Sequence, residues 1–263
     1  MTATLGYDIH GPAEAPAIVL GSSLGTTRRI WDAYLPALTA HACVITYDHL
    51  GHGESPVPDG PYRIEQLADE VSALLDEIGI DRAHHAGLSL GGMVALHFAA
   101  TAPDRVERLA IICSSAHLPP ASSWHDRAAT VRRERSTAAV ADAVFGRWFT
   151  PAFANSPPAL ACRTDLLGTP PEGYAGCCEA IAEMDLRPVL GSIRAPTLVI
   201  AGSEDPATPV EHARVVADGI QAGGTPAEIA VVPGGAHLAS VERPEEVSGM
   251  LLAHFTGSTV SVT

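Results

Sequence analysis

The chain has 263 residues, a formal net charge of −14 and a hydrophobic fraction of 46%. This length and composition suit one large folded domain and exclude an intrinsically disordered chain. The acidic balance argues against nucleic acid and anionic membrane surfaces as main partners. All 16 basic residues are arginines, which excludes chemistry that needs a lysine, such as Schiff-base formation, pyridoxal phosphate anchoring and P-loop nucleotide binding.

In chain order, the predicted elements are a strand at 16–20, a strand at 42–48, a helix at 64–78, a strand at 82–89, a helix at 91–102 that ends before Pro103, a strand at 108–115, a strand at 196–202, a helix at 209–220, a strand at 227–234 and a helix at 244–255. The predicted strands are apolar throughout rather than alternating, as is typical of strands buried on both faces of a parallel sheet. Alternating strands and helices predict an α/β fold with a mostly parallel sheet.

Residues 117–188 interrupt this alternation, because they contain no convincing strand and have helical or irregular sequence. Their place between two predicted strands suggests an inserted helical cap over the strand ends, where such sheets bind ligands. We therefore expect a core formed by residues 1–116 and 189–263, and a cap formed by residues 117–188.

Cysteine and histidine spacing gives no sign of a metal site. The five cysteines include one adjacent pair and no C-x-x-C spacing, and no H-E-x-x-H motif is present, which predicts reduced packing cysteines and no metal dependence. The first residues lack a basic region followed by an apolar run, and the apolar runs are too short to cross a bilayer. We expect a soluble cytoplasmic protein.

The motif that carries chemistry is Gly87-Leu88-Ser89-Leu90-Gly91. It fits G-x-S-x-G between a predicted strand and a predicted helix, the context of a nucleophile elbow. Ser89 is therefore the candidate nucleophile; the alternative is an ordinary glycine-rich turn. The amide of Leu90, next to the serine, is one candidate oxyanion donor, and the amide of Leu24 in the loop after the first predicted strand is the other. For Leu24 the alternative is a simple turn centred on Gly25.

A nucleophilic serine needs a base, and the base needs an orienting carboxylate. In this fold the expected chain order is serine, acid, histidine. Asp205 follows one predicted strand and His237 follows the next, in a glycine-rich loop, so both are expected at the same end of the sheet as Ser89. Glu204 and Asp185 are the alternative acids. We interpret His84 and His85, inside a predicted strand, as packing residues, and His52 as a structural loop residue.

The predicted cap is locally basic. Residues 117–150 contain five arginines and three acidic residues, a charge of +2 within a chain of −14. Arginine is suited to binding a carboxylate through two parallel hydrogen bonds, so this segment suggests an anionic substrate. The alternative is a solvated helix face.

Taken together, these segments resemble the α/β-hydrolase superfamily and, within it, the 3-oxoadipate enol-lactonase family. The resemblance covers nearly the whole chain, and its most specific segments are GPYRIEQL, RWFTPAF and GYAGCCEAIAEMDLRP. It implies Ser89 as nucleophile, Asp205 as acid and His237 as base, acting without metal or cofactor on a small anionic enol-lactone of the β-ketoadipate pathway to give 3-oxoadipate. The chain departs from the family pattern at Leu90, where methionine is usual, and at Leu50, where arginine is usual.

The resemblance also implies substrate contacts in the cap. Trp124 and Arg127, within WHDR, match the family's pair that faces the substrate, and Arg132 and Trp148 are further candidates. Because fold and triad do not determine the substrate, two other functions stay open: another small-ester hydrolase or perhydrolase, and a ligand-binding receptor with slow turnover. The sequence makes no prediction of oligomeric state.

Overall fold

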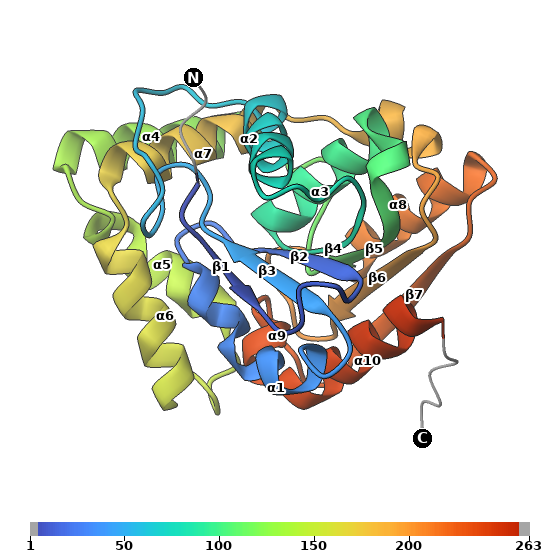
Figure 1. The fold of residues 1–263 in the computed structure, drawn as a ribbon. Coiled ribbons are helices and arrows are strands. Elements are labelled where there is room, and N and C mark those ends of the chain that lie inside the picture. Colours follow the sequence, from blue (N-terminus) through green and yellow to red (C-terminus); the bar gives the residue numbers. More distant parts are fainter. Residues whose placement is uncertain (1–4, 258–263) are drawn as a thin grey trace.

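The computed structural model describes residues 5–257 and shows one seven-stranded sheet in the order β1-β3-β2-β4-β5-β6-β7 (Figure 1). All neighbouring strands are parallel except β1 and β3. The strands are β1 Tyr7–His10, β2 Ala17–Gly21, β3 Cys43–Tyr47, β4 Ala83–Leu88, β5 Val106–Ile112, β6 Thr197–Gly202 and β7 Ala227–Val232. The predicted α/β-hydrolase fold is confirmed.

The six predicted strands all form, but the two edges of the sheet differ from the prediction. Strand β1 was not predicted; it has four residues of mixed exposure and pairs antiparallel with β3. Strand β7 is the other edge, and it exposes Glu228, Ile229 and Val231 rather than being buried on both faces. An edge strand has a neighbour on one side only, so the expectation of two buried faces was wrong for β7.

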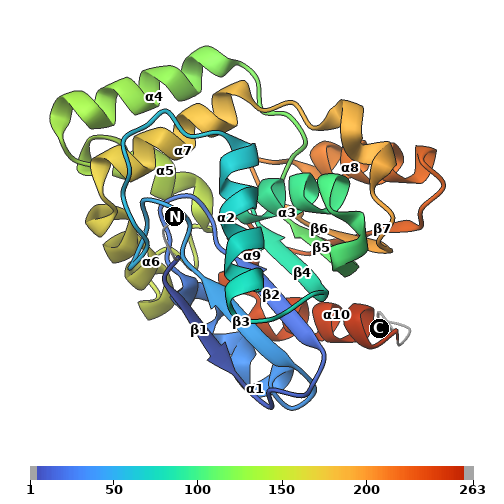
Figure 2. The same cartoon turned by 45° about the horizontal axis from the view of Figure 1, so that its top comes forward.

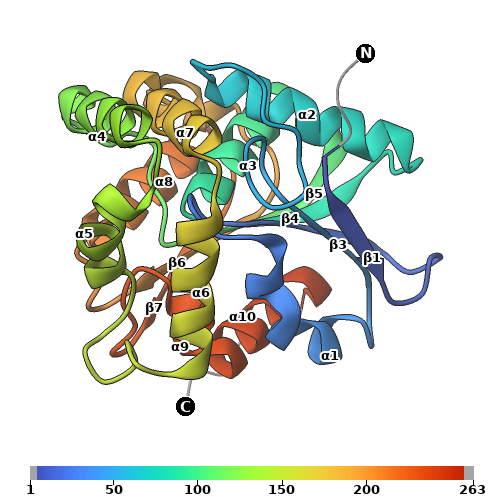
Figure 3. The ribbon, with the colours of Figure 1, turned by 90° about the vertical axis from the view of Figure 1, so that its left-hand side faces the viewer.

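Helices cover both faces of the sheet, and Figure 3 shows α2 and α3 on one face and α1 and α10 on the other. The core helices are α1 Leu35–Leu38, α2 Ile64–Glu77, α3 Leu90–Thr101, α8 Val210–Ala222, α9 Ala239–Glu242 and α10 Pro244–Thr256, with short 3-10 helices η1 Arg28–Tyr34, η2 Pro103–Arg105 and η3 Arg187–Ser192. Helix α2 buries one apolar stripe, as its periodicity predicts, and Gly79 follows with a φ of 73°.

Between β5 and β6 the chain forms a helical insertion of four helices, which lie together beside the core (Figure 2). They are α4 Ala121–Glu134, α5 Ala138–Trp148, α6 Pro157–Gly168 and α7 Pro171–Glu183. The described chain contains no strand in this segment, only an isolated bridge between His117 and Asp185. The bounds of the cap at residues 117 and 188 stay a prediction, and residues 1–4 and 258–263 of the predicted core lie outside the described residues.

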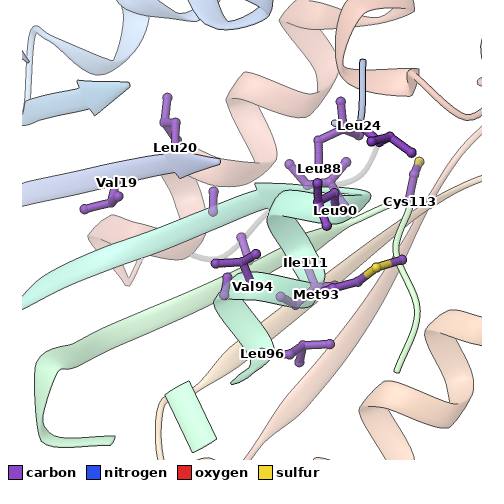
Figure 4. Packing of buried hydrophobic residues seen from close by; sticks show 14 of the residues in the cluster. Val19, Leu20, Leu24, Leu88, Leu90, Met93, Val94, Leu96, Ile111 and Cys113 are labelled. Carbon is purple, nitrogen blue, oxygen red and sulfur yellow. The ribbon is translucent and has the colours of Figure 1, made fainter. Parts of the chain in front are cut away.

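Helix α3 is the centre of the core. It packs against β2, β4 and β5, and its residues from Leu90 to Leu96 are all buried. The side chains that Figure 4 shows in this packing include Val19, Leu20, Leu88, Met93, Val94, Leu96 and Ile111. A helix that is apolar on all sides belongs inside a protein, and this burial holds the start of α3 in one place.

The buried polar groups of the core follow the sequence interpretation. The five cysteines are unpaired and buried. His84 stacks on Phe255 and His85 packs on Phe98, with ring centroids 4.9 and 4.8 Å apart. Burial lowers the pKa of His85 to about 3, so this side chain is a neutral packing residue. Within residues 5–257, no helix is both long enough and apolar enough to span a membrane.

Candidate active site

Ser89 lies at a sharp turn between β4 and α3. Its φ and ψ are 53° and −111°, a combination that costs about 1–3 kcal/mol for a residue with a side chain. Two hydrogen bonds hold this conformation: the Ser89 N–H donates to the Ile112 carbonyl at 2.9 Å, and the Ser114 hydroxyl donates to the Ser89 carbonyl at 2.7 Å. A strained serine held by its neighbours is what a nucleophile elbow requires.

The glycines around Ser89 allow three backbones to approach closely. A Cβ atom on Gly87 would lie 2.2 Å from the Gly91 carbonyl atoms, and one on Gly91 would lie 2.4 Å from those of Gly21. Side chains at these positions would separate β2, β4 and α3. The Gly91 N–H also donates to the Ser22 carbonyl at 2.9 Å. These glycines therefore serve close packing, which an ordinary flexible turn does not require.

Ser89, His237 and Asp205 form a continuous hydrogen-bonded chain. His237 Nε2 lies 3.0 Å from Ser89 Oγ, and His237 Nδ1 lies 2.9 Å from Asp205 Oδ2. The three residues are 8%, 6% and 4% exposed. His237 comes from the loop after β7 and Asp205 from the loop after β6. The carboxyl ends of these strands and of β4 meet at one edge of the sheet, and the structure brings the three predicted residues together there.

Asp205 is held as an ionised carboxylate. The N–H groups of Ala207 and Thr208 donate to Oδ1 at 2.7 and 3.0 Å, and the Thr208 hydroxyl donates to Oδ2 at 2.7 Å. Burial raises the pKa of Asp205, but the neighbouring His237 and the hydrogen bonds from His237 and Thr208 outweigh burial and lower that pKa to about 2. Of the alternative acids, Asp185 instead pairs with Arg187, and Glu204 is exposed.

The loop that carries His237 bonds to the helical insertion directly after the histidine and, through Glu242 of α9, indirectly before it. The Leu238 N–H donates to the Trp148 carbonyl at 2.8 Å, and the Ala236 N–H donates to Glu242 Oε2 at 3.1 Å. The other oxygen of Glu242 accepts from the Thr150 hydroxyl. Glu242 is 4% exposed, and sequence reasoning missed it. Its contacts link the end of α5 to the position of His237.

Of the two candidate oxyanion donors, Leu90 directly follows Ser89 and Leu24 lines the same cavity as Ser89. Leu90 is the first residue of α3, so its N–H has no acceptor one turn earlier within the helix. Leu24 lies in the loop after β2, next to Gly25, whose φ is 78°. The Gly25 N–H donates to His52 Nε2 at 2.9 Å, which gives His52 a role in holding the Leu24 loop. Leu24 and Ser89 both line the cavity described next.

A cavity of about 120 Å³ lies between Ser89 and the insertion. The core contributes Ser89 and His237, and the insertion contributes aromatic, apolar and arginine side chains. Its lining comprises Ser23, Leu24, Ser89, Leu118, Trp124, Arg127, Val144, Arg147, Trp148, Tyr174, Ile181, Pro206, Ala207, Thr208 and His237. A cavity of this size, lined by both polar and apolar side chains, suits a small ligand.

Trp124 and Arg127 lie one helical turn apart on α4 and face this cavity together. The Trp124 indole N–H donates to the Leu118 carbonyl at 3.1 Å, and the Arg127 guanidinium carbon lies 4.3 Å from the indole centroid. This stacking holds the guanidinium over the indole, and within residues 5–257 no carboxylate pairs with it. Trp148 also lines the cavity, and its contact with substrate stays a prediction.

Arg132 lies elsewhere. It pairs with Glu172 and Glu179 of α7 and does not line the cavity. Five residues along a helix correspond to a rotation of about 140°, so Arg132 faces α7 when Arg127 faces the cavity. Two residues that sequence reasoning did not select, Arg147 and Tyr174, line the cavity instead.

No group of three or more His, Cys, Asp or Glu side chains in residues 5–257 is arranged to hold a metal ion.

Comparisons with known proteins agree with this architecture. The family model described as "alpha/beta hydrolase fold" matches residues 16–244. The "3-oxoadipate enol-lactonase 2" of Acinetobacter baylyi is 37% identical over 243 residues, which cover 92% of this chain and 89% of that protein. A "putative carbamate hydrolase RutD" of Stutzerimonas stutzeri is 32% identical over 269 residues, which cover 94% of this chain and 95% of that protein.

The similarity extends to a solved structure. The enol-lactonase from Burkholderia xenovorans superimposes with a TM-score of 0.90 and 38% sequence identity, over 96% of each chain. One explanation accounts for four observations: the parallel sheet, the serine elbow, the chain order of serine, acid and histidine, and the match of the family model over most of the chain. The chain belongs to the α/β-hydrolase family.

Proposed function

We propose that this protein is a carboxylic-ester hydrolase that opens 3-oxoadipate enol-lactone to 3-oxoadipate. The hydrogen-bonded chain from Ser89 through His237 to Asp205 supports an acyl-enzyme mechanism. The relatives named enol-lactonases support the lactone as substrate. Arg127 supports a substrate with a carboxylate, because this arginine lines the cavity and, within residues 5–257, has no carboxylate partner at ion-pair distance.

The first half-reaction acylates Ser89. His237 Nε2 takes the hydroxyl proton while Ser89 Oγ attacks the lactone carbonyl carbon. The carbonyl oxygen becomes an oxyanion, which accepts hydrogen bonds from the N–H groups of Leu24 and Leu90. When the tetrahedral intermediate collapses, the ring C–O bond breaks and the leaving enol oxygen takes the proton from His237.

The second half-reaction releases the product. His237 takes a proton from water as the water oxygen attacks the acyl carbon, and the proton then passes to Ser89 Oγ as the ester bond breaks. The enol tautomerises to the ketone of 3-oxoadipate. Because the leaving group of a lactone stays attached to the acyl group, the whole molecule remains in the cavity through both halves. Asp205 stabilises the imidazolium in each half.

The observation that best supports this substrate among small esters is Arg127, which stacks on Trp124 and lines the cavity. A carboxylate accepts two parallel hydrogen bonds from a guanidinium. A neutral ester or an uncharged carbamate ester offers no charge to it.

The test is the direct spectroscopic measurement of enol-lactone loss with purified protein, beside a neutral nitrophenyl ester and a carbamate. We expect kcat/KM for the lactone to exceed that for the other two by at least tenfold. Higher activity on the neutral ester, or on the ester with peroxide, would assign the protein to small-ester hydrolases or perhydrolases. Tight binding of the lactone with turnover near zero would assign it to receptors.

A further inference from the structure

The insertion contributes a second arginine and a tyrosine to the cavity, and no mechanistic step above uses them. We propose that Arg147 and Tyr174 complete, with Arg127, a three-donor carboxylate site that selects the acyl part of the substrate. The inference deepens the proposed function and rests on it for the identity of the lactone, but the site itself requires only a small carboxylate.

Tyr174 is a buried donor without an acceptor. Its side chain is 0% exposed, it lines the cavity, and its hydroxyl has no hydrogen-bond partner in the described chain. Arg127 lies close enough to affect the pKa of Tyr174, but arginine can only donate, so the hydroxyl proton of Tyr174 is left without an acceptor. Burial raises the pKa of Tyr174, so the group stays protonated. A buried, unpaired hydroxyl is costly unless something else accepts its proton.

Arg147 is a second cation of the same kind. It lines the cavity, and within residues 5–257 no carboxylate lies at ion-pair distance from it. Burial and then the nearby charge of Arg127 lower the pKa of Arg147. Other arginines of the insertion are neutralised by the protein itself: Arg132 by two glutamates and Arg163 by Asp142.

These three groups come from three different helices, α4, α5 and α7, and all of them present donors to one cavity. Two unpaired like charges and an unpaired hydroxyl are unfavourable in an empty cavity and favourable around an anion, because a carboxylate accepts from all three. The rest of the insertion lining is aliphatic or aromatic: Leu118, Trp124, Val144, Trp148 and Ile181. A short hydrocarbon chain that ends in a carboxylate matches this combination better than inorganic phosphate does.

The experiment measures carboxylate binding separately from lactone turnover. Adipate is tested as a competitive inhibitor of neutral nitrophenyl ester hydrolysis in the wild type and in Arg147→Gln, Tyr174→Phe and Arg133→Gln. We expect the first two variants to raise the inhibition constant at least tenfold, the effect of losing one hydrogen bond to a charged group. A competitive inhibition constant reports adipate binding whatever the kcat/KM of each variant for the neutral ester. Arg147→Lys should recover part of the loss, because it keeps the charge without the fork.

Arg133→Gln is the matched control. Like Arg147→Gln, it removes one positive charge from the insertion. Because Arg133 is exposed and pairs with Glu134, the inhibition constant of adipate should not change. Thermal unfolding with and without adipate tests folding at the same time: adipate should stabilise the wild type more than Arg147→Gln. Inhibition by inorganic phosphate as strong as that by adipate would overturn the assignment to carboxylates.

The two proposals fail in different ways. If the inhibition constants of adipate for Arg147→Gln and Tyr174→Phe lie within twofold of the wild-type value, the three-donor site is wrong even if the lactone is the substrate. If adipate inhibition depends on both residues but the lactone is not hydrolysed, the carboxylate site stands and the proposed substrate is wrong.

Discussion

Replacing Asp205 by asparagine tests the catalytic geometry with the smallest change in shape. Asp205 Oδ1 accepts from two backbone N–H groups, of Ala207 and Thr208, and Oδ2 faces His237 Nδ1. The amide oxygen of asparagine must take the Oδ1 place, since the alternative sets its NH₂ group against two N–H donors. Its NH₂ group then faces His237 and donates to Nδ1, so the imidazole proton moves to Nε2. The nitrogen next to Ser89 can no longer accept a proton.

This change of tautomer removes the base without removing any side chain. We expect kcat to fall about 10⁴-fold, which corresponds to about 5.5 kcal/mol in activation free energy, while KM changes little. The assay is kcat for the enol-lactone and for a neutral ester at neutral pH, with circular dichroism to show that the variant is folded. Glu204→Gln is the control, because Glu204 is the exposed neighbour. An Asp205→Asn enzyme within tenfold of the wild type would refute the assignment of Asp205 as the orienting acid.

Three further predictions follow from the same contacts. Arg127→Ala should lower kcat/KM for the lactone about ten- to a hundredfold and leave kcat/KM for a neutral ester unchanged. Arg132→Gln should lower the unfolding temperature and leave the ratio of the two kcat/KM values unchanged. Equal effects of Arg127→Ala on both substrates would contradict the role of Arg127. Glu242→Gln should lower kcat about tenfold with little change in KM, because glutamine offers one oxygen where Thr150 and Ala236 both donate. The control is Glu246→Gln, at an exposed position. A rise in KM alone would contradict the link from α5 through Glu242 to the His237 loop. The pKa of Asp205, about 2, lies below the usual value near 3.9, so the stability that its ionisation contributes is complete above about pH 5 and lost between about pH 5 and 1. In urea titrations, the advantage of the wild type over Asp205→Asn should shrink by about 2–3 kcal/mol over that interval; an advantage independent of pH would contradict this sign.

Local patterns predicted most of the sheet and the whole hydrogen-bonded chain. A buried parallel strand appears as a short apolar run, and the elbow appears as G-x-S-x-G between a strand and a helix. Asp205 and His237 could be predicted because each follows such a strand in a loop, so topology alone sets their end of the sheet. Strand β1 carries no such signal, since its four residues, Tyr7 to His10, have mixed exposure and gain order by pairing with β3.

The cap residues were harder because their roles depend on packing between helices. Counting arginines found a basic segment but not which of them the protein neutralises: Arg132 meets two glutamates that lie 40 and 47 residues further along the chain. Arg147 and Tyr174 become neighbours of Arg127 only when three helices are assembled. Glu242 lies in a polar stretch, and only the approach of Thr150 and the Ala236 amide accounts for burying its carboxylate.

The central claim is that Ser89 opens a carboxylate-bearing lactone through an acyl-enzyme. The most direct measurement is enol-lactone hydrolysis by the wild type and by Ser89→Ala, purified in parallel, with mass spectrometry of the protein quenched during turnover. The account predicts a loss of several orders of magnitude in kcat for Ser89→Ala, and an adduct of substrate mass on the peptide that contains Ser89 in the wild type only. Comparable lactone turnover by the two proteins, or an adduct on another residue, would contradict it.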